Sequence, residues 1–433
     1  MYTREEVKAI VDKVINMAKA DAVEVSLNGG ERSGTRWANS SITTNLVQYD
    51  RQLNITVHVG DKIGTGNTRD FSDAGLQEMV DAAVEEAKQA QDNPNRPELL
   101  GPQDYIPVDG ASPDLINFSP LERAKMVRDS IDAATSKGVL GAGYIPKDDV
   151  TTCNANSKGL FAYYRNAVTG FDLTCRMPDG SGSGWAGLNG IHDLHMIDAK
   201  ALTDEAADTA IKSRNAKATE PGRYTVIMKS HANARFLSLI TGSFGGGGGR
   251  GGGFLTGKKV GDKVLSDLFT LKSDVGNPIL RQTSILADNL PAKPVTWVEN
   301  GILKAMGQQP ATVNNNLVMV GSDLTLEDMI KQTRRGLLVS GLWYIRGVPA
   351  EGQPLLNTGM TRDGLFLIEN GEIVGPVQNF RWNMSPIVGY NNLTLVGKPM
   401  PMATGEAYSD GGIALVPPVR IDDFYMTSIS PAV

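Results

Sequence analysis

The chain has 433 residues, of which 41% are hydrophobic and 21% charged, and its formal net charge is −6. This composition is typical of a globular protein that is long enough for two domains. The acidic balance disfavours broad attraction to nucleic acid or anionic lipid, and no apolar run reaches the roughly 18 residues that predict a membrane span.

The N-terminus and the cysteines favour a cytoplasmic protein. Charged residues stand near the start, where a secretory signal would need an apolar segment. Cys153 and Cys175 are the two cysteines, too few for a disulfide framework, and we interpret both as buried free thiols.

The first 90 residues predict a compact unit of helices and strands. Apolar residues recur at helical spacing over residues 4–20 and again over residues 73–91, where Ser72 is the expected N-cap. Between the helices we expect three strands, with turns at Gly29-Gly30 and Gly60-Asp61. The expected strands are residues 22–27, 35–47 and 52–59, and His58 is expected to face solvent in the last of them.

A proline-rich stretch follows at about residues 92–120 and is interpreted as an extended connector. Ser119, Pro120 and Glu122 form a capping-box pattern, which predicts a helix from residue 120 to Lys137-Gly138. We then expect a meander of short strands over residues 139–177 with a turn at 156–159, a flexible loop over 180–190 and a helix over 199–211.

We place a domain boundary near residue 220, at Pro221-Gly222. The predicted fold class is α+β with two domains: an N-terminal domain of helices and antiparallel strands, residues 1–220, and a strand-rich C-terminal domain, residues 221–433. The second domain should contain a strand at 224–228 followed by a helix at 231–240, and a helix at 324–335 with Thr325 as N-cap. Further strands are expected at 337–345, 393–396 and 413–415.

Asn370-Gly371 lies between two apolar runs, residues 365–368 and 373–380, and predicts a hairpin with a type I′ turn. Around it stand five arginines that could hold a peptide carboxylate or an acidic partner, although surface ion pairs are the more common explanation. They are Arg334, Arg335, Arg346, Arg362 and Arg381. Trp343, Tyr344 and Trp382 are more commonly core or interface anchors than platforms for a ligand. From this region we select Tyr344, Arg346, Arg381 and Asn383 as candidate peptide- or partner-binding residues.

Two other motifs are weaker. The glycine-rich stretch between Gly245 and Gly253 leads into an incomplete phosphate-loop pattern, because Lys259 stands where a hydroxyl should bind Mg²⁺, and we interpret the stretch as a surface loop. His192 and His195 have a metal-like spacing but no third ligand nearby, and a polar strand edge is the simpler interpretation.

The run G-L-F-L-I-E-N-G-E-I-V-G-P-V-Q-N-F-R-W-N-M-S, from Gly364 to Ser385, resembles the TldD/PmbA family, known as modulators of DNA gyrase and as a zinc-peptidase system. In the catalytic branch a helix carries H-E-x-x-x-H, in which two histidines bind zinc and the glutamate activates water. Aligned to that motif without gaps, this chain has Ser238, Leu239 and Ser243 at the ligand and base positions.

The resemblance is therefore to the PmbA (TldE) branch, which lacks the motif. It implies a subunit with no catalytic residue and no metal ligand, paired with a TldD-like H-E-x-x-x-H subunit that holds the zinc. The pair would degrade unfolded peptides or trim leader peptides. Two alternatives stay open: a self-associating scaffold that binds peptides as a dimer with itself, and a metal-independent hydrolase.

Overall fold

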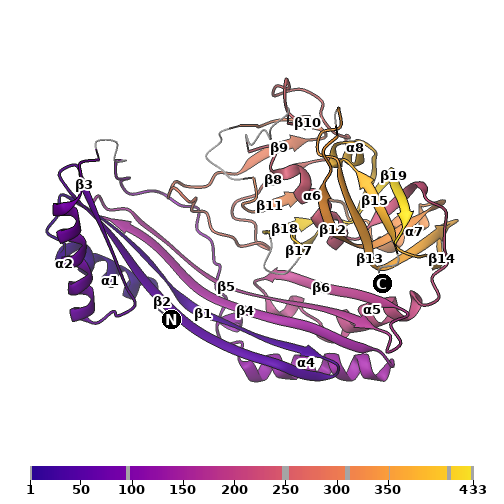
Figure 1. Cartoon of the computed structure of the whole chain (residues 1–433), viewed down its shortest axis with the longest axis horizontal. Coiled ribbons are helices and arrows are strands. Elements are labelled where there is room, and N and C mark those ends of the chain that lie inside the picture. Colours follow the sequence, from indigo (N-terminus) through magenta and orange to yellow (C-terminus); the bar gives the residue numbers. More distant parts are fainter. Residues whose placement is uncertain are drawn as a thin grey trace.

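The computed structural model describes residues 2–93, 98–245, 253–307, 313–350, 352–406 and 411–430. It shows an α+β fold in which an elongated N-terminal sheet curves beneath a strand-rich C-terminal half (Figure 1), which confirms the predicted fold class. The boundary near residue 220 stays a prediction. Residues 246–252 of the glycine-rich stretch lie outside the described residues. No helix in the described ranges is long and apolar enough to cross a membrane.

Six antiparallel strands form the N-terminal sheet in the order β3-β2-β1-β4-β5-β6. Four of them, each 16 to 19 residues long, give the sheet its length and carry it under the C-terminal half (Figure 1). The strands are β1 (Ala22–Ala38), β2 (Ser41–Val59), β3 (Lys62–Thr68), β4 (Leu140–Asn156), β5 (Phe161–Arg176) and β6 (Ser183–Ile191).

Helices cover one face of this sheet and leave the other face to the C-terminal half (Figure 1). Along β4, Ile145 and Cys153 are buried toward the helices, so alternation directs Tyr144 and Asp148 to the opposite face. The helices are α1 (Arg4–Met17) and α2 (Asp73–Gln89) at one end, and α3 (Pro113–Ile116), α4 (Pro120–Ser136) and α5 (Ala199–Lys212) at the other.

The helix caps agree with the sequence. The Ser72 side chain accepts a hydrogen bond from the Gly75 amide at the start of α2, and Ser119 and Glu122 form the predicted capping box of α4. Cys153 and Cys175 are buried free thiols, as predicted. Burial raises the pKa of each thiol to about 12, which keeps both protonated at neutral pH.

The predicted turn at Gly29-Gly30 is wrong, because both glycines lie inside β1, paired with β2 and β4. A Cβ on Gly30 would lie 2.3 Å from the carbonyl oxygen of Asp149, so glycine is needed there for close strand approach. The turn is at Asn39 and Ser40, both with positive φ. His58 was expected to face solvent but is buried, with Nε2 3.2 Å from a Glu24 carboxylate oxygen on β1.

The expected short strands over residues 139–177 are two long strands, β4 and β5, joined at the predicted turn. The loop expected at 180–190 is wrong, since most of that segment forms β6. Its glycines allow α5 to pack directly on the strand: a Cβ on Gly184 would lie 2.3 Å from the Ala206 carbonyl oxygen. Glycine here marks close backbone contact and not a flexible loop.

Two sheets form most of the C-terminal half. The larger has the order β12-β7-β19-β15-β13-β14, and β12 also pairs with β13, which closes five of these strands into a ring; β16 pairs with β19. These strands are β7 (Gly222–Met228), β12 (Arg335–Gly347), β13 (Asn357–Glu369), β14 (Glu372–Pro376), β15 (Phe380–Met384), β16 (Leu393–Val396) and β19 (Val419–Ile429).

The smaller sheet has the order β10-β9-β8-β11-β18-β17. Its strands are β8 (Leu271–Ser273), β9 (Val295–Glu299), β10 (Ile302–Leu303), β11 (Leu317–Met319), β17 (Met400–Ala403) and β18 (Ile413–Val416). The helices that accompany the two sheets in the described residues are α6 (Ser230–Thr241), α7 (Leu326–Lys331) and α8 (Pro386–Asn391).

The predicted hairpin is present: Asn370 and Gly371 have φ of 53° and 82° and join β13 to β14. Its second arm ends at Pro376, earlier than expected, and β15 is a separate strand that pairs with β13 and β19. Thr325 caps α7 as predicted, but this helix is shorter than expected because Arg335 already belongs to β12.

Candidate functional site

Helix α6 follows β7 directly and contacts both C-terminal sheets. Its Phe236 ring packs against Trp382, Tyr390 and Phe424, with ring centroids 6.2, 5.3 and 5.8 Å away. Asn233 lies one helical turn before Phe236, and its side-chain oxygen accepts a hydrogen bond from the Tyr390 hydroxyl at 2.8 Å. The helix is therefore held on several sides by apolar packing and by a satisfied polar pair.

Ser238, Leu239 and Ser243 lie at the C-terminal end of α6 and in the turn that follows it. The Ser238 hydroxyl donates to the carbonyl of Arg235 at 2.8 Å, and Leu239 packs against the main core with part of its side chain exposed. These side chains are two hydroxyls and a hydrocarbon, so none of them is a good zinc ligand or a proton acceptor.

His231, at the start of α6, joins this helix to the N-terminal sheet. Its ring stacks on Trp185 of β6 with centroids 3.7 Å apart and planes 19° from parallel. Burial, with Arg235 and Lys229 nearby, lowers the pKa of His231 well below its usual value, so the imidazole is neutral at pH 7. The side chain acts as an aromatic contact between the two halves of the chain.

Arg235 is the central cation of a buried polar cluster beside α6. Its guanidinium donates to the carbonyl oxygens of Leu342, Gly405 and Glu406, at 3.3 Å for Gly405 and 3.0 Å for Glu406, and lies 5.4 Å from the Trp343 ring centroid. Burial lowers the pKa of Arg235 to about 10, which still leaves it charged at neutral pH.

A second arginine, Arg362, approaches the same ring, 4.9 Å from its centroid, and lies 3.7 Å from the Asp363 carboxylate. Asp363 accepts a hydrogen bond from the Ser183 hydroxyl of β6 at 3.1 Å. The cluster thus ties the C-terminal sheet to the edge of the N-terminal sheet. Burial raises the pKa of Asp363, with Arg362 acting in the opposite direction.

Asp172 of β5 belongs to the same cluster and is expected to make stability pH-dependent. Burial raises its pKa from 3.8 to about 6, although Arg36 and Arg235 act to lower it. The folded chain therefore holds this proton more tightly than the unfolded chain, so the contribution of Asp172 to stability falls as pH rises from about 4 to 6. Asp172→Asn should raise the free energy of unfolding by about 1–2 kcal/mol at pH 7.5 and by less at pH 4.5.

The measurement is urea denaturation at the two pH values, with Asp204→Asn as the control. Hydrogen bonds from Lys200 and Lys137 lower the pKa of Asp204, so that variant should be destabilised at pH 7.5. An Asp172→Asn variant that is equally or less stable than the wild type at pH 7.5 would contradict the effect assigned to burial.

The four candidate binding residues lie on two strands, β12 and β15, which pair with opposite edges of β13. Arg346 of β12 and Asn383 of β15 both pair with Thr358 of β13, so they occupy one row across the sheet, and Arg381 lies two residues from Asn383 on the same face. Tyr344 lies in a β12 irregularity with φ of 53° and is 49% exposed. The Arg346 guanidinium lies 4.6 Å from its ring centroid.

These residues therefore form one patch on the face opposite to buried Trp382, in which Tyr344, Arg346 and Arg381 are exposed and Asn383 is half-buried. The patch adjoins the Arg235 cluster at Glu406, whose backbone carbonyl accepts from Arg235. Asn383 also lines a cavity of about 400 Å³ together with Arg223 and Tyr425. Whether the patch binds a peptide or a partner stays a prediction. Arg346 of the patch lies 3.9 Å from Glu406, and Arg335, outside the patch, lies 3.9 Å from Glu369; both distances fit weak ion pairs.

Known protein families account for most of the chain. A model described as the PmbA/TldA metallopeptidase C-terminal domain matches residues 221–307 and 305–428, and one described as PmbA/TldA metallopeptidase domain 1 matches residues 23–87. The chain belongs to the TldD/PmbA family. A Methanothermobacter thermautotrophicus protein described as a metalloprotease is 22% identical over 324 residues, 67% of this chain and 69% of that relative.

Solved structures of TldD/PmbA proteins share the fold. TldE from Thermococcus kodakarensis has a TM-score of 0.79 and 18% identity, covering 96% of this chain and 100% of its own. A Thermotoga maritima protein described as a modulator of a DNA gyrase has the same TM-score and 16% identity, covering 97% and 99%. At these identities the likeness shows the fold alone, while the family matches show a peptidase-related protein.

The zinc that the family implies does not fit the residues present. Within the described ranges, no group of three or more His, Cys, Asp or Glu side chains is arranged to hold a metal ion. His192 is buried, with Nδ1 3.2 and 3.1 Å from the carbonyl oxygens of Gly110 and Ala167, whereas His195 is exposed beside Asp114. His192 and His195 therefore have different environments and different partners.

Proposed function

We propose that this chain is the non-catalytic, metal-free subunit of a zinc-peptidase heterodimer, working in the cytoplasm on unfolded peptides. The observation that carries the proposal is the chemistry of α6. Helix α6 is firmly packed, and by the resemblance it corresponds to the family's metal-binding helix, with Ser238, Leu239 and Ser243 at the positions of the ligands and the base.

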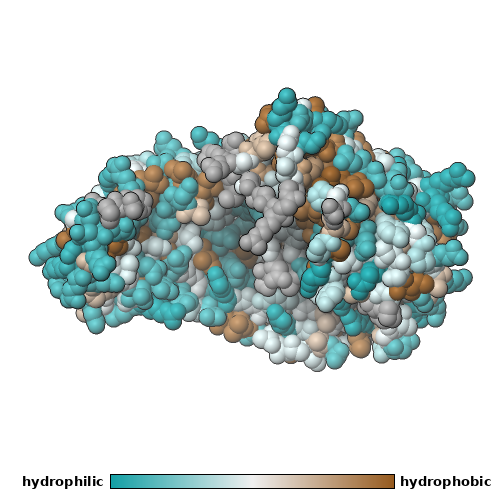
Figure 2. All heavy atoms as spheres, turned by 45° about the horizontal axis from the view of Figure 1, so that its top comes forward, coloured by the Kyte–Doolittle hydropathy of each residue, from teal (hydrophilic) through white to brown (hydrophobic). Residues whose placement is uncertain are grey.

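The remaining contacts suit a subunit that forms a rigid wall of a substrate cleft. Two contacts connect the N-terminal sheet to the C-terminal half: the Trp185 ring stacks on His231, and the Ser183 hydroxyl donates to Asp363. Figure 2 shows a hollow, largely polar surface between the end that carries α1 and α2 and the C-terminal half. Family membership supports the peptidase-related role, and the proposal adds that the zinc and the reacting groups come from a TldD-like partner.

The proposal is tested by co-expressing the untagged chain with a tagged TldD-like protein that carries H-E-x-x-x-H. We expect the two to co-purify and to cleave an unstructured peptide in a chelator-sensitive reaction, with zinc bound only in the complex. The control is the same complex with the glutamate of the partner's motif replaced by alanine. Stoichiometric zinc in the pure lone chain, or cleavage by that chain that survives chelation, would overturn the proposal.

A further inference from the structure

Strand β5 has one edge that is only partly covered. Strand β4 pairs with it from Phe161 to Arg176, but β6 covers only the part from Thr169 to Arg176 on the other side. In the described part of the chain, no strand pairs with this second edge over residues 161–168. An uncovered edge presents backbone donors and acceptors that can pair with another extended chain.

The direction of these backbone groups follows from Ala167. Its N–H donates to the Gly110 carbonyl at 2.7 Å and its carbonyl accepts from His192, so both groups point away from β4. Because the direction alternates along a strand, Phe161, Tyr163 and Arg165 also present their N–H and C=O groups outward. The outward groups of Phe161, Tyr163 and Arg165 have no hydrogen-bond partner among the described residues. The Gly110 backbone lies close to the Arg165 carbonyl, since a Cβ on Gly110 would be 2.7 Å from that oxygen, so the open part of the edge runs from Phe161 to the Arg165 N–H.

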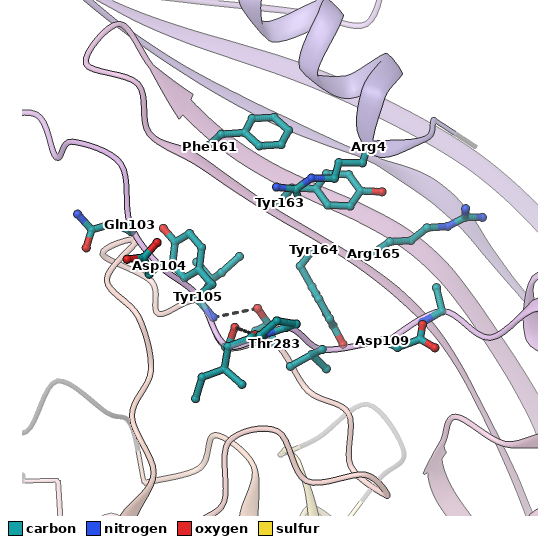
Figure 3. Close-up of a pocket in the computed structure, with 17 residues that line it drawn as sticks. Arg4, Gln103, Asp104, Tyr105, Asp109, Phe161, Tyr163, Tyr164, Arg165 and Thr283 are labelled. Atoms are coloured by element: carbon teal, nitrogen blue, oxygen red, sulfur yellow. Dashed lines mark hydrogen bonds between the residues drawn. The ribbon is translucent and has the colours of Figure 1, made fainter.

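A cavity of about 550 Å³ lies along this edge (Figure 3). Its walls come from the N-terminus of α1, the edge of β5, the connector and a C-terminal segment. Its lining residues include Arg4, Tyr105, Phe161, Tyr163, Tyr164 and Arg165. The cavity therefore combines a row of unpaired backbone groups with aromatic side chains.

The two sides of the cavity are fixed independently. On the connector side, the Tyr105 hydroxyl donates to the Asn289 carbonyl at 2.6 Å, and the Ser284 hydroxyl donates to the Ile106 carbonyl at 2.7 Å. These bonds hold the connector to the C-terminal half. Among the described residues, the connector makes one backbone hydrogen bond to β5, from the Ala167 N–H to the Gly110 carbonyl. The connector thus diverges from β5 and leaves a preformed groove.

The strand side also carries a cation. The Phe161 and Tyr163 rings stack with centroids 6.1 Å apart, and the Arg4 guanidinium lies 4.9 and 5.4 Å from those two centroids. Arg165 is paired with Asp149 through two hydrogen bonds of 2.8 Å. Arg4 has no carboxylate within ion-pair distance among the described residues, so its charge favours an acidic group in the groove.

We propose that residues 161–165 bind an extended polypeptide segment, which pairs with this edge as an added strand and places an acidic side chain near Arg4. The outward N–H and C=O groups repeat every second residue, about 7 Å apart. An extended peptide has the same repeat, so its backbone can form a hydrogen bond with each of them. The site goes beyond the proposed function, because it lies on the N-terminal half of this chain and requires no catalytic partner.

The first test uses a fluorescein-labelled peptide of four Glu-Val repeats, measured by fluorescence polarisation on the full chain alone. Tyr163→Thr and Tyr163→Pro both remove the ring, but only Tyr163→Pro also removes the N–H that points away from β4. The hydrogen bonds between β5 and β4 are kept in both variants. We expect Tyr163→Pro to bind at least tenfold more weakly than Tyr163→Thr. Equal binding by the two variants would overturn main-chain pairing at this edge.

The second test keeps the wild-type chain and changes the peptide, so it does not depend on folding of a proline variant. Methyl groups are placed on the backbone nitrogens of either the valines or the glutamates. Because the N–H groups of alternate residues point to opposite edges of a strand, one isomer should lose binding at least tenfold and the other should retain it. Equal binding of both isomers, or no binding of the unmethylated peptide at millimolar concentration, would overturn the proposal. Neither result depends on whether a zinc-bearing partner exists.

Discussion

Replacing Phe236 with alanine should lower the free energy of unfolding by about 3–5 kcal/mol, the range expected when a buried aromatic ring is deleted. The ring is fully buried and packs against Trp382, Tyr390 and Phe424. These neighbours belong to two strands and a helix that fix the position of α6, so they cannot collapse easily into the space left by the ring. The measurement is urea denaturation followed by tryptophan fluorescence.

The matched control is Leu239→Ala, three residues further along the same helix. Part of the Leu239 side chain is exposed at the edge of the core, so its truncation should cost about 1–2 kcal/mol. Similar losses for the two variants would contradict the packing assigned to α6. In that case α6 would not be the buried, rigid element described above.

Local signals in the sequence predicted where three of the helices begin. Ser72, Ser119 and Thr325 cap the helices that they were expected to begin, because a capping hydrogen bond depends on residues three positions apart. Asn370-Gly371 likewise specified a turn within four residues. Such features need no information from the rest of the chain.

Strand boundaries were predicted less well because glycine has two structural uses. Gly30 and Gly184 were assigned to a turn and a loop, yet each allows a neighbouring carbonyl to approach within a distance that a Cβ would forbid. That neighbour comes from β4 in one case and from α5 in the other. Only the tertiary fold distinguishes a glycine that permits close packing from one that permits a turn.

The cluster around Arg235 was missed for a similar reason. Its members come from β5, β6, α6, β12 and β13, so no sequence window contains them together. One signal was available: Arg235 is a cation among the apolar residues Ala232, Phe236 and Leu237 of the predicted helix. A charge at such a position must be paired or hydrogen-bonded within the fold.

Replacing Arg235 with methionine should destabilise the chain by about 2–4 kcal/mol, because the carbonyl oxygens of Leu342, Gly405 and Glu406 would lose a charged donor inside the protein. Methionine retains much of the aliphatic volume, so the loss reports hydrogen bonds more than a cavity. The carbonyls belong to β12 and to residues 405–406, and the guanidinium holds these two segments against α6. Urea denaturation at pH 7.5 measures the effect.

Arg362→Met is the matched control, since Arg362 approaches the same Trp343 ring. Its side chain is 29% exposed and its ion pair with Asp363 is long, at 3.7 Å, so its removal should cost less than about 1 kcal/mol. If both variants lost the same stability, contact with the tryptophan ring would explain both effects. A larger loss of stability for Arg235→Met would show that the difference comes from the hydrogen bonds to the buried carbonyls. These bonds include the one that connects α6 to β12.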